Sequence, residues 1–172
     1  ASSIDNSEII EEKNYFEDIV SEIRKQSQNV KKIYSDKNEK GKIFEEKKIY
    51  NYENISNAMG SKQTQVGVIW GEKDDNVIAC LARGKEFTDK KLPDGSWYYF
   101  GQGAKGDQSW NFANQLIRDK QIYLFNNLGP SEIDKKRRRK KNRYEHIGLF
   151  FCDHWEYIIS KDKNREGDKM IR

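Results

Sequence analysis

The stretch from Trp97 to Lys120, WYYFGQGAKGDQSWNFANQLIRDK, joins three local patterns that decide the fold around it. It opens with an aromatic run, which favours a strand. Three closely spaced glycines follow, and the last part has apolar residues at helical spacing. We therefore expect a strand, a glycine loop and a short helix, with the remaining chain built to support them.

The three glycines, Gly101, Gly103 and Gly106, satisfy the pattern Gly-x-Gly-x-x-Gly. A dinucleotide fold places this pattern after a buried strand rich in Val, Ile and Leu, usually at the start of its domain. Here bulky aromatic residues precede it in mid-chain. A phosphate loop is excluded because Asp107 and Gln108 stand where Lys and Ser or Thr would follow. A turn that merely reverses the chain remains an alternative.

Positive charge is concentrated in one stretch, although the net charge of the chain is only +4. We call this stretch the basic run: Lys135, Lys136, Arg137, Arg138, Arg139, Lys140, Lys141 and Arg143. Such a dense run repels itself, so we expect a solvated or disordered loop. A phosphate backbone is the polyanion that it would most readily neutralise. A purely solubilising loop and a nuclear-localisation signal are the alternatives.

Length and composition predict one compact domain with an appendage, because 172 residues suffice for a single core. Aromatic residues make up 12% of the chain, which indicates an aromatic-rich core. No apolar run reaches membrane-spanning length and no signal peptide opens the chain, so we expect a soluble, cytoplasmic protein without membrane contact. Cys80 and Cys152 lie in apolar runs, which favours free thiols over a disulfide.

The chain divides into three predicted parts. Residues 1–41 form an N-terminal segment with an amphipathic helix, or two in series, over residues 7–34 and a linker behind it. Residues 42–161 form the compact domain, and residues 162–172 are a charged, frayed tail.

Within the compact domain, short apolar or aromatic runs alternate with turn residues. The expected strands cover 65–70, 77–81, 96–100, 121–125, 144–152 and 155–159, with a weaker strand pattern over 42–52. The first two read as a hairpin, the turn 93–95 launches the third, and residues 126–130 break the fourth. Short strands with one helix predict an α+β domain with a curved, barrel-like sheet.

Candidates for catalysis or metal binding are few. The two histidines, His146 and His154, have no evident catalytic partner. Cys152 and His154 lack the second ligand pair of a zinc site. We therefore expect no catalytic residue, no metal and no cofactor. The enzyme alternative is a metal-dependent nuclease using Glu72, Asp74, Asp75 and Glu86.

Several spaced motifs point to one family. An aromatic-x-Gly-x-Gly loop over 98–105 runs into Gly106-Asp107-Gln108, and Asn114 follows six residues after Gln108. The further motifs are 117–119, 122–125 and 146–152, preceded by 60–63 and Gly67. Together, over residues 56–160, they resemble the SRA (SET- and RING-associated, or YDG) domain of McrA-type HNH restriction endonucleases. The resemblance implies an SRA/PUA-like fold.

The resemblance also implies a site. SRA domains flip a modified cytosine between two aromatic rings, with an Asp at the edge of the base. By motif, Tyr99 falls on one ring position, while Phe87 and Asp89 resemble the other ring and its acidic partner. Trp97, from the same aromatic run as Tyr99, completes the expected base pocket. Plain core packing is the alternative for Phe87 and Tyr99.

The glycine loop gains a purpose in this interpretation, because backbone without side chains can approach a flipped nucleotide closely. The expected DNA-binding loop comprises Gly101, Gln102, Gly103 and Lys105. Short polar side chains often hold loops through backbone hydrogen bonds, and three are expected to brace this one: Asp107, Gln108 and Asn114. The basic run would supply phosphate contacts.

The resemblance implies a recognition domain of a modification-dependent, type IV-like restriction system. Its partner would be double-stranded DNA carrying 5-methyl- or 5-hydroxymethylcytosine, with the nuclease on a missing segment or a partner subunit. A reader of modified RNA or of phosphorothioate DNA remains an alternative, as does the nuclease.

Overall fold

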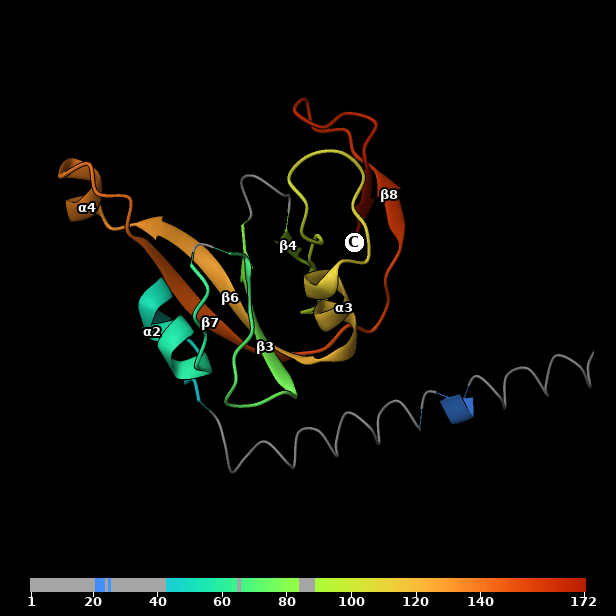
Figure 1. The fold of residues 1–172 in the computed structure, drawn as a ribbon, viewed down its shortest axis with the longest axis horizontal. Coiled ribbons are helices and arrows are strands. Elements are labelled where there is room, and N and C mark those ends of the chain that lie inside the picture. The colour runs from blue at the N-terminus through green and yellow to red at the C-terminus, as the bar shows by residue number, and fades with distance from the viewer. Residues whose placement is uncertain (1–20, 24, 26–42, 65, 84–88) are drawn as a thin grey trace, which may run out of the picture. The chain divides into compact units, whose positions relative to one another are not determined.

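The computed structural model describes residues 21–23, 25, 43–64, 66–83 and 89–172, drawn in colour in Figure 1. The chain forms two compact units, Ala1–Ile43 and Phe44–Arg172. In the first unit, residues 21–23 and 25 are helical. The rest of the predicted N-terminal helix lies outside the described residues. In the described part of the chain, every helix is too short or too polar to cross a membrane.

The second unit is built on a mixed five-stranded sheet with strand order β1-β7-β6-β3-β2. Its strands are β1 (Ile49–Tyr50), β2 (Val68–Ile69), β3 (Val77–Ala82), β6 (Gln121–Pro130) and β7 (Asn142–Phe150). The predicted hairpin is confirmed, because β2 pairs antiparallel with β3. In contrast, β3 and β6 are parallel, with Val77 opposite Gln121.

Strand β3 lies at the centre of the core, and all six of its residues are buried. Its alternating side chains enter two separate clusters. One cluster packs Ala79 and Leu81 against Ile55 of α2 (Tyr52–Met59), and the other packs Ile78 and Cys80 with Ala113 of α3 (Phe112–Asp119). The two helices therefore cover opposite faces of the sheet (Figure 1).

Two small sheets complete the unit. Strand β4 (Lys90–Lys91) pairs with β5 (Trp97–Tyr98), and β8 (Tyr157–Ile159) pairs with β9 (Lys169–Ile171). The predicted turn at 93–95 joins β4 to β5, with Gly95 at φ 88°. The α+β class is confirmed. The described strands form three separate sheets and no closed barrel, so the barrel-like curvature is not confirmed.

The structure contains a helix, α2, that the sequence analysis did not predict. Asn51 caps its start by accepting a hydrogen bond from Asn54 N at 2.7 Å, and Gly60 ends it in the left-handed conformation at φ 68°. The weak strand pattern covered 42–52, and of its described residues, 43–52, β1 is the part that forms a strand. Three of the eight residues of α2, Asn54, Ser56 and Asn57, are of types that favour turns over helix interiors, so the segment carries no clear helical signal.

Strand β6 is longer than predicted. The turn residues at 126–130 were expected to end it, but it continues to Pro130 in register with β7. Register shifts between Leu124 and Phe125, and between Asn127 and Gly129, let the hairpin absorb these residues as irregularities.

The basic run is not simply a loop. Lys135 and Lys136 belong to a short helix, α4 (Glu132–Lys136), and Arg137 and Arg138 form the turn behind it. All of the run from Lys135 to Lys141 is exposed, as its charge requires. It occupies the tip of the β6–β7 hairpin (Figure 1).

The predicted frayed tail is wrong. Residues 169–171 form β9, and Arg165, Met170 and Ile171 are buried. Strand β9 pairs with β8 and is also joined by hydrogen bonds to the glycine loop, described below. This long-range pairing has no local sequence signal, because the segment is short and mostly charged.

Candidate nucleic-acid interface

The glycine loop, residues 101–108, is fixed at its start by α3. Asn114 is buried, with 1% of its surface exposed. Its side-chain oxygen accepts from Gln102 N at 2.7 Å, and its amide nitrogen donates to Gln102 O at 3.0 Å and Ser109 O at 2.8 Å. The first helical turn therefore sets the conformation of the loop entry.

The end of the loop is fixed by β9. The Gln108 side chain donates to Gly101 O and accepts from Ile171 N at 2.7 Å. The Asp107 carboxylate accepts from Lys169 N at 2.7 Å. All three side chains assigned to bracing thus form hydrogen bonds to backbone groups.

Arg165 holds the outer part of the loop, which the sequence analysis missed. Its guanidinium donates to Gly103 O at 2.6 Å and to Gly106 O at 2.9 Å, and it lies 3.5 Å from an Asp168 oxygen. Only 7% of Arg165 is exposed. Nothing in the charged tail distinguishes this arginine from its neighbours, so the sequence offers no signal for it.

These contacts explain two of the glycines. A Cβ at Gly101 would lie 3.0 Å from the side-chain oxygens of both Asn114 and Gln108, so Gly101 makes room for the bracing network. Gly106 is left-handed at φ 67°, where a side chain would be strained.

The outer loop has backbone donors that are not used within the described protein. Residues 103–107 are exposed. Within the described part of the chain, the N–H groups of Ala104, Lys105 and Gly106 have no acceptor. The carbonyls of Gly103 and Gly106 are bound by Arg165, while the N–H groups of residues 104–106 remain available, an arrangement that can bind an anion. The exposed Lys105 side chain adds a positive charge.

Gln102 was also assigned to the DNA-binding loop, but its side chain contacts the main sheet and is not part of the exposed outer loop. Its amide rests against the edge of β2. With its oxygen turned toward that edge, it accepts from Val68 N at 2.8 Å and from Gly67 N at 3.2 Å. Gln102 is half-buried in this position, so in this structure it joins the loop to the main sheet.

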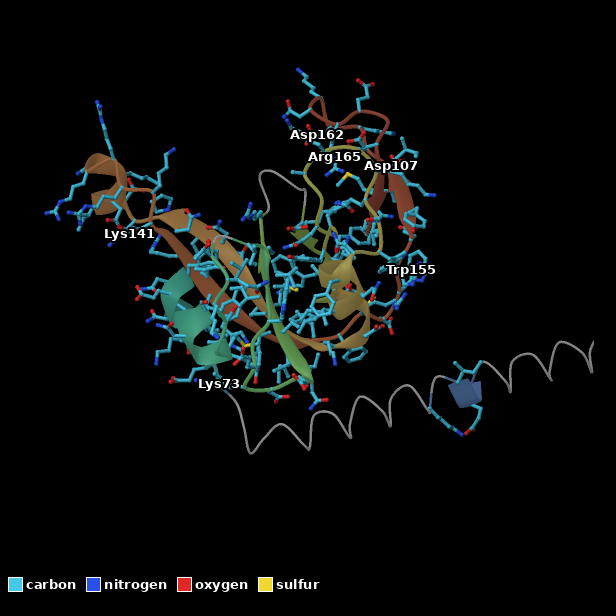
Figure 2. All side chains as sticks on the ribbon, viewed as in Figure 1. Lys73, Asp107, Lys141, Trp155, Asp162 and Arg165 are labelled. Atoms are coloured by element: carbon cyan, nitrogen blue, oxygen red, sulfur yellow. The ribbon has the colours of Figure 1, made fainter. Side chains whose placement is uncertain are left out.

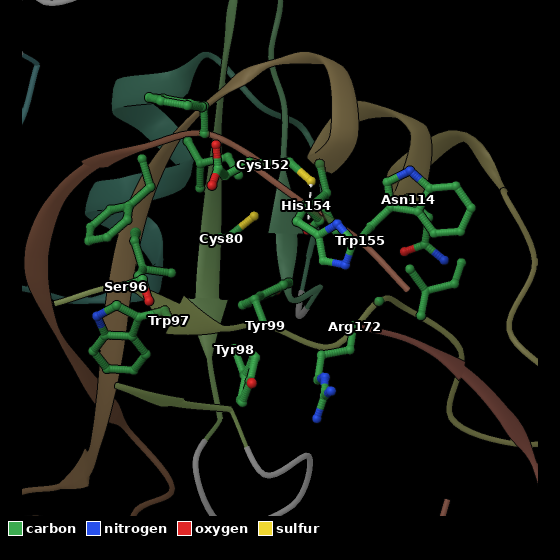
Figure 3. Close-up of a pocket in the computed structure, with 18 of the residues that line it drawn as sticks. Cys80, Ser96, Trp97, Tyr98, Tyr99, Asn114, Cys152, His154, Trp155 and Arg172 are labelled. Carbon is green, nitrogen blue, oxygen red and sulfur yellow. Dashed lines mark hydrogen bonds between the residues drawn. The ribbon is translucent and has the colours of Figure 1, made fainter. Parts of the chain in front are cut away.

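Beside the loop lies a cavity of about 250 Å³ (Figure 3). Gly101 and Asn114 form part of its wall. Its aromatic lining comes from β5 and the residue after it, from the segment before α3, and from the end of β7 and the segment that follows: Trp97, Tyr98, Tyr99, Trp110, Phe150, Phe151, His154 and Trp155. The structure thus brings Trp97 and Tyr99 of the predicted base pocket into one cavity with the glycine loop.

Tyr99 is held firmly in the cavity wall. Its hydroxyl donates to Gly67 O at 3.2 Å, and burial raises its pKa well above the usual value, so it stays neutral. Trp97 is half-buried, and among the residues that the structure describes its indole Nε1 finds no acceptor. Both rings offer apolar faces rather than charge.

Asp89 lies next to the cavity but does not line it. It is buried, and its two carboxylate oxygens accept from Arg83 N and Phe100 N, each at 2.8 Å. Burial raises its pKa to about 6, against the opposing effect of these two N–H groups. Contact with a base edge stays a prediction for Asp89. Phe87 lies outside the described residues.

The cavity rim holds aromatic residues that the sequence analysis did not assign. The rings of Trp110 and Trp155 meet edge to face, with centroids 4.6 Å apart. The Arg172 guanidinium lies 4.2 Å from the Tyr98 ring centroid and pairs with Glu156. Trp155 opens the predicted strand over 155–159, which was the available signal.

The basic run is remote from the cavity. Ile122 and Phe150 line the cavity and pair with each other, whereas Pro130 pairs with Asn142 at the other end of the hairpin. Leu124 is the cavity-lining residue of β6 nearest the hairpin tip, and the six residues from there to Pro130, at about 3.3 Å each, separate the two surfaces by roughly 20 Å. Figure 2 shows Lys141 and Trp155 at opposite ends of the unit.

Candidates for catalysis do not converge in the described residues. Glu72, Asp74 and Asp75 are exposed on the β2–β3 connection, and Glu86 lies outside the described part. Among the described side chains, no three His, Cys, Asp or Glu residues are grouped as a metal site would require. Cys80 and Cys152 are both free thiols.

Comparison with known proteins identifies the family. Residues 40–124 match the family model described as the ScoMcrA-like SRA domain. The match includes the aromatic lining from β5, the glycine loop and α3. No curated protein and no solved structure matches the chain. The chain therefore carries an SRA domain of the ScoMcrA-like family, which is a DNA-binding recognition module and not itself a catalytic one.

Proposed function

We propose that the unit formed by residues 44–172 recognises a modified base in duplex DNA by taking the flipped base into the aromatic cavity. A base inside a duplex hides the edge that a protein must inspect, so recognition requires its extrusion into a pocket. The marks that we propose, 5-methyl- and 5-hydroxymethylcytosine, are those that the family resemblance implies.

The cavity is the observation that supports this proposal. Its volume of about 250 Å³ lies just below the roughly 300 to 1,000 Å³ of pockets for drug-sized ligands. That size suits a single base. Stacking on aromatic rings is worth about 1–3 kcal/mol per base, which is comparable with the cost of unstacking.

Phosphate contacts would then supply the remaining affinity. The free N–H groups of residues 104–106 and the Lys105 side chain would hold the backbone beside the extruded nucleotide. The basic run, roughly 20 Å away, would reach a phosphate about six base pairs along a duplex that rises about 3.4 Å per pair.

Competition binding tests the proposal. Matched duplexes carry cytosine, 5-methylcytosine, 5-hydroxymethylcytosine, methyladenine or a phosphorothioate linkage, and an RNA arm is included. We expect a modified-cytosine duplex to bind best. We expect Tyr99→Ala and Trp97→Ala to remove this preference while leaving weak, salt-sensitive binding to all duplexes.

The control is Phe112→Ala, which removes an aromatic side chain that is 59% exposed and does not line the cavity. It should keep the preference. Equal binding to every duplex by the unaltered protein, or equal loss on plain and modified DNA in both cavity variants, would contradict a base pocket. Preferred binding to the phosphorothioate duplex or to the RNA would instead identify the domain as a reader of phosphorothioate DNA or of RNA.

The restriction context belongs to the same proposal. A recognition module needs a separate catalytic part to cleave DNA, so we place the nuclease on another segment or on a partner subunit. Cleavage of DNA by the purified 172-residue chain with a divalent metal would favour the nuclease alternative instead.

A further inference from the structure

A row of rings and cations runs from the cavity rim onto the β8–β9 hairpin. We call it the aromatic ladder: Arg118, Trp110, Trp155, Tyr157 and Lys169. The Arg118 guanidinium lies 4.9 Å from the Trp110 ring centroid. The Trp110 and Trp155 centroids are 4.6 Å apart, and those of Trp155 and Tyr157 are 5.4 Å apart. Lys169 Nζ lies 4.2 Å from the Tyr157 centroid.

The ladder is assembled from distant parts of the chain, so local structure does not account for it. Trp110 and Arg118 flank or belong to α3, Trp155 precedes β8, Tyr157 belongs to β8, and Lys169 to β9. Each contact is a ring-to-ring or ring-to-cation contact. The aromatic faces are therefore held in a defined order by the fold.

The outer end of the ladder is open. Trp155 is 38% exposed and Tyr157 is 39% exposed, as Figure 2 illustrates for Trp155 at the edge of the unit. Arg118 forms an ion pair with Asp119, and Arg172 nearby is paired with Glu156. Among the described residues, Lys169 has no carboxylate within ion-pair distance. The ladder thus ends in an exposed ring beside an uncompensated positive charge.

We propose that the aromatic ladder binds unpaired DNA nucleotides next to the cavity. Exposed rings accept bases by stacking without regard to sequence, and cations between them neutralise the phosphates. A double helix hides the faces of its bases, so it cannot use this surface. The inference rests on the proposed function for its biological setting, because extruding one base leaves the opposite base unpaired and the adjacent bases stacked on one side only.

Binding of a short single-stranded DNA of mixed sequence, without any modified base, tests the ladder directly. Tyr157 and Lys169 are the informative positions, because neither lines the cavity. We expect Tyr157→Ala to weaken single-strand binding by about 5- to 150-fold, the range that corresponds to the loss of one stacked base. Tyr157→Phe should restore it, because the ring remains.

Lys169→Gln should lower the slope of log Kd against log salt concentration by about 0.7, the value for one phosphate on a single strand. Phe112→Ala is the matched control, since Phe112 is an exposed ring that contacts Trp70 outside the ladder. It should bind single strands like the unaltered protein.

Wild-type single-strand binding by Tyr157→Ala, or an equal loss in Phe112→Ala, would overturn the ladder. So would absence of single-strand binding by the unaltered chain. The modified-duplex preference is measured in parallel with the same proteins. The single-strand assay contains no modified base. Loss of the ladder proposal would therefore leave the modified-duplex preference standing, and loss of that preference would leave single-strand binding by the ladder standing.

Discussion

Asp89 is a buried carboxylate that holds two segments of the chain together and has a raised pKa. Its carboxylate ties the end of β3, through Arg83 N, to the start of the glycine loop, through Phe100 N. Its side chain is nonetheless buried, and burial raises its pKa to about 6 from an ordinary value of 3.8. A group that holds two segments together is thereby sensitive to pH.

We predict that Asp89 makes the stability of the unit fall as pH rises from about 4 to about 6. A carboxyl group with a raised pKa in the folded state stabilises the fold fully below its unfolded pKa. That contribution disappears as the pH passes through the folded value. A shift of about two units corresponds to about 3 kcal/mol. Urea unfolding at several pH values measures it.

Asp89→Asn is the control, because it removes the titration while keeping the side-chain shape. Its stability profile should lack the decline between pH 4 and 6. Parallel profiles for the two proteins would show that Asp89 titrates normally and that burial does not govern its ionisation.

At the scale of elements, the glycine loop depends on the C-terminal segment. The loop and β9 are joined by hydrogen bonds from Gly101 N to Ile171 O at 2.8 Å and from Gln108 N to Lys169 O at 2.7 Å. Arg165 adds its two hydrogen bonds to the carbonyls of Gly103 and Gly106. The conformation that presents the loop is therefore determined by residues far from it in sequence.

We predict that Arg165→Ala loosens the loop and lowers the free energy of unfolding by about 1–3 kcal/mol, because two carbonyls lose their donor. Hydrogen exchange should become faster at Gln108 and Ile171, and affinity for the preferred duplex should fall. Lys163→Ala, at an exposed neighbouring position, is the control. Unchanged exchange rates in Arg165→Ala would mean that β9 and α3 hold the loop without Arg165.

Local signals predicted some elements well and missed others for a physical reason. The strand, glycine loop and helix around Gly101, and the hairpin ending in β3, follow from neighbouring residues. Helix α2 was missed because three of its eight residues, Asn54, Ser56 and Asn57, are of types that favour turns over helix interiors. The role of Arg165 was missed because its partners lie 59 and 62 positions away, beyond any local pattern.

The residues of the candidate site also fall into two groups, those that a local motif predicts and those that only the tertiary packing brings to the cavity. Trp97, Tyr99 and Gly101 belong to the aromatic and glycine motif of the sequence and line the cavity. Trp110 and Trp155 also line it, but they arrive there only through the packing of α3 and the segment before β8. A single sequence cannot reveal which distant rings share a wall.

At the scale of the whole molecule, the basic run and the aromatic cavity lie at different ends of the β6–β7 hairpin, which leads to a measurable prediction. Replacing Arg137, Arg138 and Arg139 by Ala should weaken binding to modified and plain duplexes by the same factor. The reason is that these side chains lie at the hairpin tip, away from the base pocket. The slope of log Kd against log salt concentration should fall by about 0.9 for each phosphate that the arginines neutralise.

A charge-matched variant with Lys62, Lys73 and Lys163 replaced by Ala serves as the comparison, since all three are exposed on other surfaces. It should affect the salt slope less. Selective weakening on modified DNA in the arginine variant would instead place the hairpin tip in base recognition.

The parallel pairing of β3 with β6 has a consequence for protein engineering. Parallel neighbours must be linked by a long crossover, and here residues 83–120 supply it, bearing β4, β5, the glycine loop and α3. The strands of the main sheet pair with one another, while one face of the sheet packs against this connection through Ala113 of α3. A graft that exchanges the segment together with the β8–β9 hairpin, and keeps the residues that pack on β3, would therefore transplant a different specificity onto the same scaffold.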